Sequence, residues 1–115
     1  MEAATIQGMQ TVIYPVGDVA RARALFRALL GVDPYTDGPY YVGFRAAGQE
    51  IGLDPHGHRQ GMTGYWHVAD IRAALRSLLD AGAQVIEDVR TVGPGRLIAS
   101  VRDPDGNIIG LLQSS

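Results

Sequence analysis

Only a few residues of this 115-residue chain have the chemistry that catalysis or polar ligand recognition requires. His67 follows Trp66 in a run of aromatic and β-branched residues. An imidazole there is a candidate general base or hydrogen-bond anchor, and a hydrogen-bonded structural histidine is the alternative. Glu50 is the second candidate, either turned inward toward a basic ligand or, as we favour, lying on the surface of a strand. The catalytic residue is therefore unknown from sequence, with His67 and Glu50 as candidates.

The segment Asp54-Pro-His-Gly-His58 places a carboxylate and two imidazoles at alternate positions. These groups can bind divalent metal ions. The proline and glycine between them are typical of a solvated loop, and we predict that the segment is a linker with no metal role. The chain has no cysteine, which excludes a disulfide framework and a thiolate metal site.

The charge pattern excludes several classes of partner. The ten basic residues are all arginines and are scattered among twelve acidic residues, for a net charge of −2. We therefore expect no nucleic-acid partner, which would require a basic stripe.

The hydropathy pattern gives no sign of a membrane segment. We expect no membrane partner, because no apolar run approaches the roughly 20 residues that span a bilayer. Residues 1–10 do not have the features of a signal peptide, so a soluble, cytoplasmic, single-domain protein is expected.

The elements that position these residues are expected to form an internal repeat. Thr11, Val16 and Asp18 recur at one constant spacing as Thr63, Val68 and Asp70. Each copy reads as a strand, an aspartate that caps a helix, and an amphipathic helix. The first helix is expected over residues 18–30 with Gly31 as its C-terminal cap, and the second is expected from residue 70 to a stop at 81–83.

The remaining segments are expected to be strands and turns. In the first half the pattern predicts a strand at 9–16, a loop with one short edge strand at 31–39, and a hairpin of 40–45 and 49–54 that turns at Ala47-Gly48. In the second half it predicts strands at 84–89, 97–102 and 108–113, with turns at 91–95 and 103–107. Tyr14 and Trp66 are expected to pack against the helices.

The run Arg102-Asp-Pro-Asp-Gly-Asn-Ile-Ile-Gly110 resembles the closing hairpin of the glyoxalase/bleomycin-resistance/dioxygenase superfamily, also called vicinal-oxygen-chelate proteins. The two helices, with Leu-Leu-Gly and Leu-Leu-Asp-Ala-Gly-Ala at their ends, resemble its two helices. The resemblance implies an α+β fold in which two βαβββ modules form a curled mixed sheet around a central cavity. We expect modules at 6–54 and 63–113, a linker at 55–62, and a homodimer.

The same resemblance implies where metal-using members place their four ligands. Those positions hold hydroxyls or no side chain here, namely Thr11, Gly52, Thr63 and Gly110, although a register slip would bring Glu50 or Ile51 near the second position. A neutral hydroxyl is a weak ligand for a catalytic divalent ion, and glycine has no side chain to offer. We therefore predict no metal site and no cofactor.

Strand alternation places a set of mostly apolar residues on the inward face. Glycines at positions 52 and 110 are expected to leave the cavity larger, drier and less charged, although a filled core is the alternative. Tyrosines 35, 40 and 41 are expected at the rim. The predicted ligand-binding residues are Thr11, Ile13, Gly52, Thr63, Tyr65, His67, Ile108, Gly110, Leu112, Tyr40 and Tyr41, with Pro15 on the same face.

These observations favour metal-independent binding of a small aromatic or amphipathic organic molecule, similar to bleomycin-resistance sequestration. The alternative is a lyase, isomerase or dioxygenase of the same superfamily that works with no metal or with displaced ligands such as Glu50 and His67. A third possibility is a structural or regulatory dimer whose cavity is closed.

Overall fold

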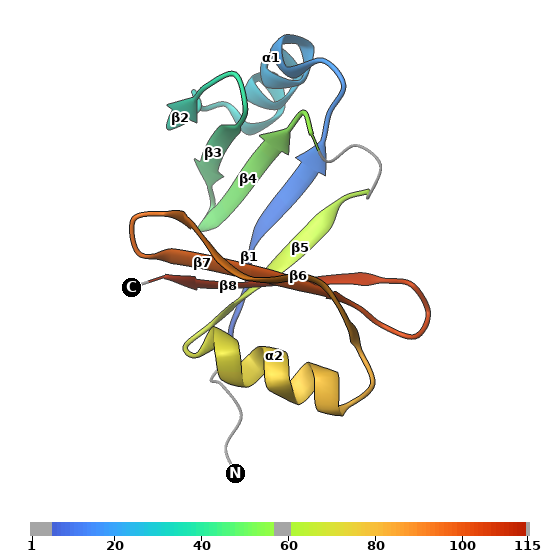
Figure 1. Ribbon diagram of the computed structural model, residues 1–115. Helices are drawn as coiled ribbons and strands as arrows, with labels where there is room; N and C mark the ends of the chain where they lie inside the picture. The colour runs from blue at the N-terminus through green and yellow to red at the C-terminus, as the bar shows by residue number, and fades with distance from the viewer. Residues whose placement is uncertain (1–5, 57–60, 115) are drawn as a thin grey trace. The chain divides into compact units, whose positions relative to one another are not determined.

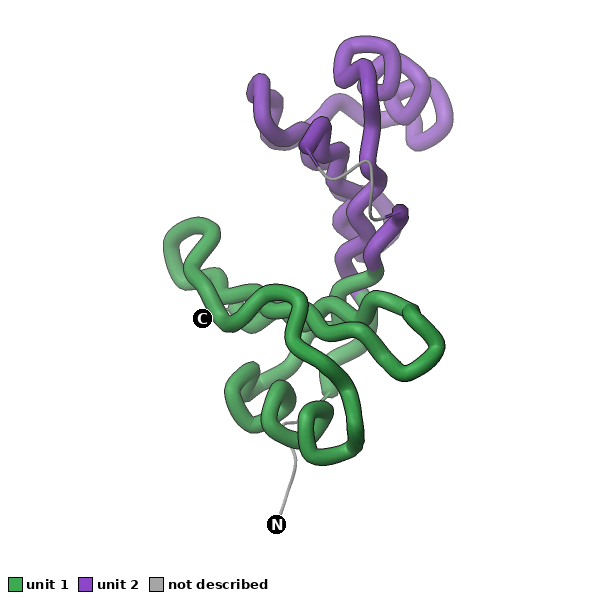
Figure 2. Tube along the Cα trace, turned by 45° about the vertical axis from the view of Figure 1, so that its right-hand side comes forward, with its two compact units in different colours: residues 1–9, 64–115 green, residues 10–63 purple. Residues whose placement is uncertain are grey.

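A computed structural model describes residues 6–56 and 61–114 of the chain. The chain divides into two compact units, residues 10–63 and residues 1–9 together with 64–115, which we call the N-terminal and C-terminal units (Figure 2). The described residues form eight strands and two helices. Neither of these helices has the length and the apolar character needed to cross a membrane.

The N-terminal unit contains one helix and a mixed set of strands in the order β2-β3-β4-β1 (Figure 1). β3 pairs antiparallel with β2 and β4, whereas β1 pairs parallel with β4. The first residues of β1 are assigned to the other unit. The elements are β1 (Ile6–Pro15), α1 (Val19–Leu30), β2 (Thr36–Asp37), β3 (Val42–Ala46) and β4 (Gln49–Asp54).

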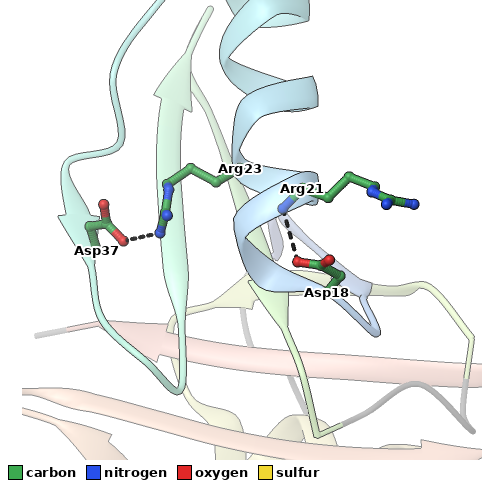
Figure 3. A network of polar contacts seen from close by, with 4 residues as sticks. All are labelled: Asp18, Arg21, Arg23 and Asp37. Carbon is green, nitrogen blue, oxygen red and sulfur yellow. Dashed lines mark hydrogen bonds and ion pairs between the residues drawn. The ribbon is translucent and has the colours of Figure 1, made fainter.

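Helix α1 begins and ends at the predicted residues. The Asp18 side chain accepts a hydrogen bond from the Arg21 backbone N–H at 3.0 Å, and the Arg23 guanidinium lies 2.8 Å from the Asp37 carboxylate on β2 (Figure 3). Gly31 ends the helix in a left-handed conformation with φ 72°, which glycine adopts without strain. The apolar side of the helix packs on a core of Val42, Phe44 and Leu53 through Val19, Ala22, Phe26 and Leu30.

The C-terminal unit repeats this arrangement with the strand order β5-β8-β7-β6. Its first strand again pairs parallel with its last strand, and the others pair antiparallel. The elements are β5 (Thr63–Val68), α2 (Ile71–Asp80), β6 (Gln84–Gly93), β7 (Arg96–Arg102) and β8 (Ile108–Ser114). Thr63 at the start of β5 belongs to the N-terminal unit.

Helix α2 is capped from two directions. The Asp70 carboxylate accepts the Ala73 N–H at 3.1 Å, and the Gln113 amide oxygen from β8 accepts the Ile71 N–H at 2.8 Å. These bonds satisfy donors that have no partner within the helix. The helix covers a core of Val68, Ile71, Ala74, Leu75, Ala99, Val101 and Leu111.

The predicted fold class is confirmed, because each unit is a βαβββ arrangement of helix and mixed strands. Two local predictions were wrong. β6 does not end at Val89 but continues to Gly93, since its β-branched residues keep pairing with β7 up to the Gly93–Arg96 pair. Trp66 is 37% exposed and does not belong to the helix-covered core, whereas Tyr14 packs against Phe26 of α1 as predicted, with the two rings tilted and their centroids 4.9 Å apart.

Candidate functional site: a buried carboxylate held by tyrosines

The Glu50 carboxylate lies at the centre of a polar cluster in the N-terminal unit. Along β4, Ile51 and Leu53 pack on the α1 side of the sheet, so Glu50 and Gly52 project from the opposite face. Glu50 is only 8% exposed. A charged group at such a position is stable only when hydrogen bonds replace its lost hydration.

Three hydroxyl groups supply those hydrogen bonds. Tyr41 donates to Oε2 of Glu50 at 3.0 Å, and Tyr35 donates to the same oxygen. Thr11, which lies directly opposite Glu50 on β1, donates to Oε1 at 3.5 Å. We call Thr11, Tyr35, Tyr41 and Glu50 the Glu50 cluster. Because the phenolic protons point at the carboxylate, the cluster offers mainly acceptor oxygens to any further partner.

Two glycines allow the tyrosine rings to reach the carboxylate. Gly43 on β3 and Gly52 on β4 are directly paired. A Cβ added to Gly52 would lie 2.6 Å from Cε1 of Tyr41 and from Cδ1 of Ile13, and a Cβ on Gly43 would lie 2.8 Å from Cε1 of Tyr35. The rings therefore rest against bare backbone, which is a recurrent use of glycine in strands.

Two predictions about this face were wrong. Glu50 was expected on the surface, but it is buried and hydrogen-bonded because tyrosines outside its own strand cover it. Gly52 was expected to leave a larger, drier and less charged space. Tyr41 and Ile13 fill the space beside Gly52 instead, and the charge of this face resides on Glu50, two residues earlier in the strand.

The C-terminal unit brings together a second group of predicted residues. Tyr65 is paired with Gly110 and His67 with Leu112, and these side chains share one face of β5 and β8. A Cβ on Gly110 would lie 2.6 Å from Cδ1 of Tyr65, so the aromatic ring occupies the space that we expected to be open. Of the other predicted residues in this unit, Leu112 is buried and Ile108 is half-buried, whereas Thr63 is buried and belongs to the N-terminal unit.

The Asp54–His58 segment adopts a local turn as far as it is described. The Asp54 side chain accepts the His56 N–H at 2.8 Å, and the His56 ring stacks on Tyr40 at a centroid distance of 5.5 Å. His58 lies outside the described residues. Tyr40 is 71% exposed, so it does not join the Glu50 cluster. Within residues 6–56 and 61–114, no three acidic or histidine side chains come together in a way that would hold a metal ion.

The roles of Tyr35, Gly43 and Arg45 were not predicted from the sequence. Tyr35 is a hydrogen-bond donor to Glu50, and the Arg45 guanidinium lies 3.8 Å from the centroid of the Tyr35 ring. One signal was present in the sequence. The predicted hairpin turn at Ala47-Gly48 fixes the pairing of β3 with β4, and it places Gly43 opposite Gly52 and Arg45 opposite Glu50.

Comparison with known proteins identifies the fold. Methylmalonyl-CoA epimerase from Mycobacterium tuberculosis matches with a TM-score of 0.80 at 16% identity, over 100% of this chain and 93% of that one. A superfamily member from Vibrio splendidus 12B01 matches with a TM-score of 0.71 at 18% identity, over 96% and 100% of the two chains. The Mn(II)-bound glyoxalase from Novosphingobium aromaticivorans matches with a TM-score of 0.73 at 17% identity, over 96% of this chain and 40% of that one.

At these identities the structural matches show the fold alone. No curated protein sequence matches the chain. The model of one protein family, however, matches residues 8–111, which is nearly the whole chain. The chain therefore belongs to the Glyoxalase/Bleomycin resistance protein/Dioxygenase superfamily.

Proposed function

We propose that this protein binds a small aromatic or amphipathic organic molecule without the help of a metal ion. The proposal rests on one observation, the burial and hydrogen bonding of the Glu50 side chain. Its carboxylate is the buried acid of the site, and three hydroxyl groups from Thr11, Tyr35 and Tyr41 surround it. Hydrogen bonds from hydroxyl donors to a carboxylate are stronger than those between neutral groups, and they replace the hydration that the buried group has lost.

The available donor set does not fit the divalent ion that metal-using members of the superfamily hold. The four positions implied by the resemblance provide two hydroxyls and two glycines, namely Thr11, Thr63, Gly52 and Gly110. Divalent transition metals favour imidazole and carboxylate ligands, and Mg²⁺ and Mn²⁺ favour several charged oxygens. These four residues therefore do not fit a catalytic metal ion.

Affinity in this proposal comes from two sources. Apolar and aromatic side chains remove the ligand from water, and the Glu50 cluster orients any hydrogen-bond donor that the ligand carries. The remaining predicted contacts are Ile13, Tyr40, Thr63, Tyr65, His67, Ile108 and Leu112. The proposal includes modules at 6–54 and 63–113 with a linker at 55–62, and a homodimer that light scattering of the purified protein would detect.

A thermal-shift screen tests the binding proposal. Wild-type protein is scanned against aromatic and amphipathic compounds with and without EDTA. A ligand that binds only the folded state at 100 times its Kd stabilises the protein by ~2.7 kcal/mol. We expect at least one compound to raise Tm by the same amount in both buffers, because no metal takes part.

Glu50→Gln, which removes the charge but keeps the shape of the side chain, should reduce that shift. The matched control is Glu87→Gln, because Glu87 lies on β6, pairs with Arg90 and is not among the predicted ligand contacts. A shift that disappears in EDTA and returns on adding zinc or manganese would overturn the proposal. A complete lack of shifts across the screen would instead favour a structural dimer.

A second candidate function is supported by the same carboxylate. A buried glutamate beside two phenols can accept or return a proton, so a metal-free isomerase or lyase is the alternative. Incubation of each screening hit in D₂O distinguishes the two functions. Sequestration leaves the compound unlabelled, whereas proton transfer introduces deuterium at a carbon atom in wild-type protein and not in Glu50→Gln.

A further inference from the structure

Arg45 is a charged residue next to the Glu50 cluster, and it has no role in the function proposed above. It lies on β3 directly opposite Glu50 and is exposed. The Cζ atom of its guanidinium lies over the Tyr35 ring, 3.8 Å from the centroid. By contrast, Arg23, Arg27 and Arg90 each pair with a carboxylate, whereas Arg45 forms no ion pair with any residue of the described ranges.

The stacking leaves the recognition edge of this guanidinium open. Contact with an aromatic ring uses the flat face of the group, and the N–H donors lie in its plane. These donors have the geometry that binds a carboxylate or phosphate through two parallel hydrogen bonds. The contact with the ring therefore restrains the guanidinium without using its N–H donors as an ion pair would.

The Tyr35 ring that contacts Arg45 is itself held in place. The hydroxyl of Tyr35 is bound to Glu50 and its ring rests against Gly43. Because both the ring and its hydroxyl are restrained, the guanidinium above the ring loses little further freedom when it binds an anion. Such preorganisation favours affinity for a ligand of matching shape.

We infer that Arg45 is an anion-recognition residue, and that the ligand carries a carboxylate or phosphate group that contacts it. This inference rests on the proposed function and narrows its ligand class. The Glu50 cluster presents acceptor oxygens and a negative charge, so the part of the ligand facing it carries a hydrogen-bond donor. The ligand is thus an amphoteric small molecule whose acid and donor are separated by about the span of the Tyr35 ring.

The test uses aromatic acids paired with their primary amides. The probes are para-aminomethylbenzoate, para-hydroxyphenylacetate and indole-3-acetate, together with inorganic phosphate as an anion without an aromatic body. Titration calorimetry on wild-type protein should show tighter binding of each acid than of its amide. In Arg45→Gln the affinity for the acids should fall about tenfold or more, and the acid and amide should become equal.

Arg45→Lys separates charge from geometry, since lysine keeps the charge but lacks the planar fork. We expect it to recover only part of the acid preference. Arg21→Gln is the matched control, because Arg21 is an exposed arginine on α1 away from the cluster, and its binding should equal wild type. Urea unfolding of Arg45→Gln checks that the variant folds. We expect that it does, because the Arg45 side chain is exposed.

Each outcome discriminates. Equal binding of acids and amides to wild type, or an acid preference that survives in Arg45→Gln, would overturn the role of Arg45 while leaving the binding function standing. If the acids, the amides and inorganic phosphate all fail to bind, the role of Arg45 is overturned and the result counts against the proposed function for aromatic ligands. Binding of inorganic phosphate alone, lost in Arg45→Gln, would support the anion site and assign the preference to phosphate.

Discussion

At the scale of single residues, the hydroxyl groups around Glu50 determine whether a charge can remain buried. An isolated carboxylate in an apolar environment is strongly destabilising, and hydrogen bonds to it are worth more than those between neutral groups. Tyr35, Tyr41 and Thr11 provide such bonds from different segments of the N-terminal unit. Loss of one donor should therefore lower the folding stability of that unit.

Replacing Tyr41 by phenylalanine tests this idea. The ring stays beside Gly52, but the bond of 3.0 Å to Glu50 is lost. We expect the free energy of unfolding to fall by about 1–3 kcal/mol, measured by urea denaturation, because a buried acceptor loses a donor. The neighbouring Tyr40→Phe is the control, since Tyr40 is 71% exposed and should change stability by less than about 0.5 kcal/mol. Equal effects of the two variants would contradict the buried-carboxylate account.

Residue roles were the hardest feature to predict from sequence. The alternation of side chains along a strand correctly separates the face with Thr11 and Gly52 from the helix-covered face, because this alternation depends only on residues next to one another in the sequence. It cannot show that Tyr35 reaches over β3 to cover Glu50, since this depends on how a nearby segment folds back. The burial of Glu50 could therefore not be predicted from the sequence, because it depends on where the tyrosine side chains lie in the folded unit.

At the scale of elements, the β3–β4 hairpin provides the bare surface on which the tyrosine rings lie. Gly52→Ala would place a methyl group 2.6 Å from Tyr41 and Ile13 atoms, which is closer than side chains can approach. We expect a loss of about 1–3 kcal/mol in unfolding free energy from this overpacking. Gly17→Ala is the control, since nothing lies within 4 Å of its added Cβ.

A double-mutant cycle identifies the cause of that loss. If the Tyr41 ring is the obstacle, Gly52→Ala should cost less in a Tyr41→Ala background, with a coupling energy of about 0.5 kcal/mol or more. Strictly additive effects of the two substitutions would mean that the ring does not rest on Gly52.

The turn between β7 and β8 gives a pH-dependent prediction. Hydrogen bonds from the side chain and backbone of Asn107 hold the pKa of Asp103 below its ordinary value of 3.8. A carboxyl whose pKa is lowered by folding stabilises the folded state above the unfolded pKa, and this contribution is lost as the pH falls through the folded pKa. Asp103→Asn should therefore lower Tm at pH 7 and differ progressively less from wild type as the pH falls below about 4.

The control for the turn is Asp105→Asn. The Asp103 carboxylate accepts the N–H groups of Asp105 and Asn107, whereas these bonds do not involve the Asp105 side chain. Thermal melts of the three proteins between pH 7 and pH 3 give the comparison. A Tm difference between Asp103→Asn and wild type that is constant across this range would show that the lowered pKa contributes nothing to stability.

Element positions were largely predictable because their signals are local. Asp18 and Asp70 cap the helices, Gly31 ends the first, and Ala47-Gly48 forms the hairpin turn with positive φ at both residues. The end of β6 was missed because Thr91 was assigned to a turn. Its β-branched side chain favours continued pairing, and the turn is confined to Pro94 and Gly95.

At the scale of the whole molecule, the chain contains two copies of one topology with different chemistry on each copy. The N-terminal unit carries a buried acid with tyrosine donors on its last strand, β4, and the C-terminal unit carries Tyr65 and His67 on its first strand, β5. The repeat and the superfamily followed from sequence, since helix caps and the closing turn are encoded locally. The ligand did not, because one fold accommodates many functions through differences in the residues of its site.

The most direct test of metal independence is the metal content of protein purified without chelator, measured by mass spectrometry of the intact native protein and by elemental analysis. We predict far less than one zinc, nickel, iron or manganese ion per chain, with identical values for wild type and Glu50→Gln. One ion per chain that is lost in Glu50→Gln would contradict the account, because it would mean that a bound cation, and not hydrogen bonds from the hydroxyl groups alone, stabilises the buried carboxylate.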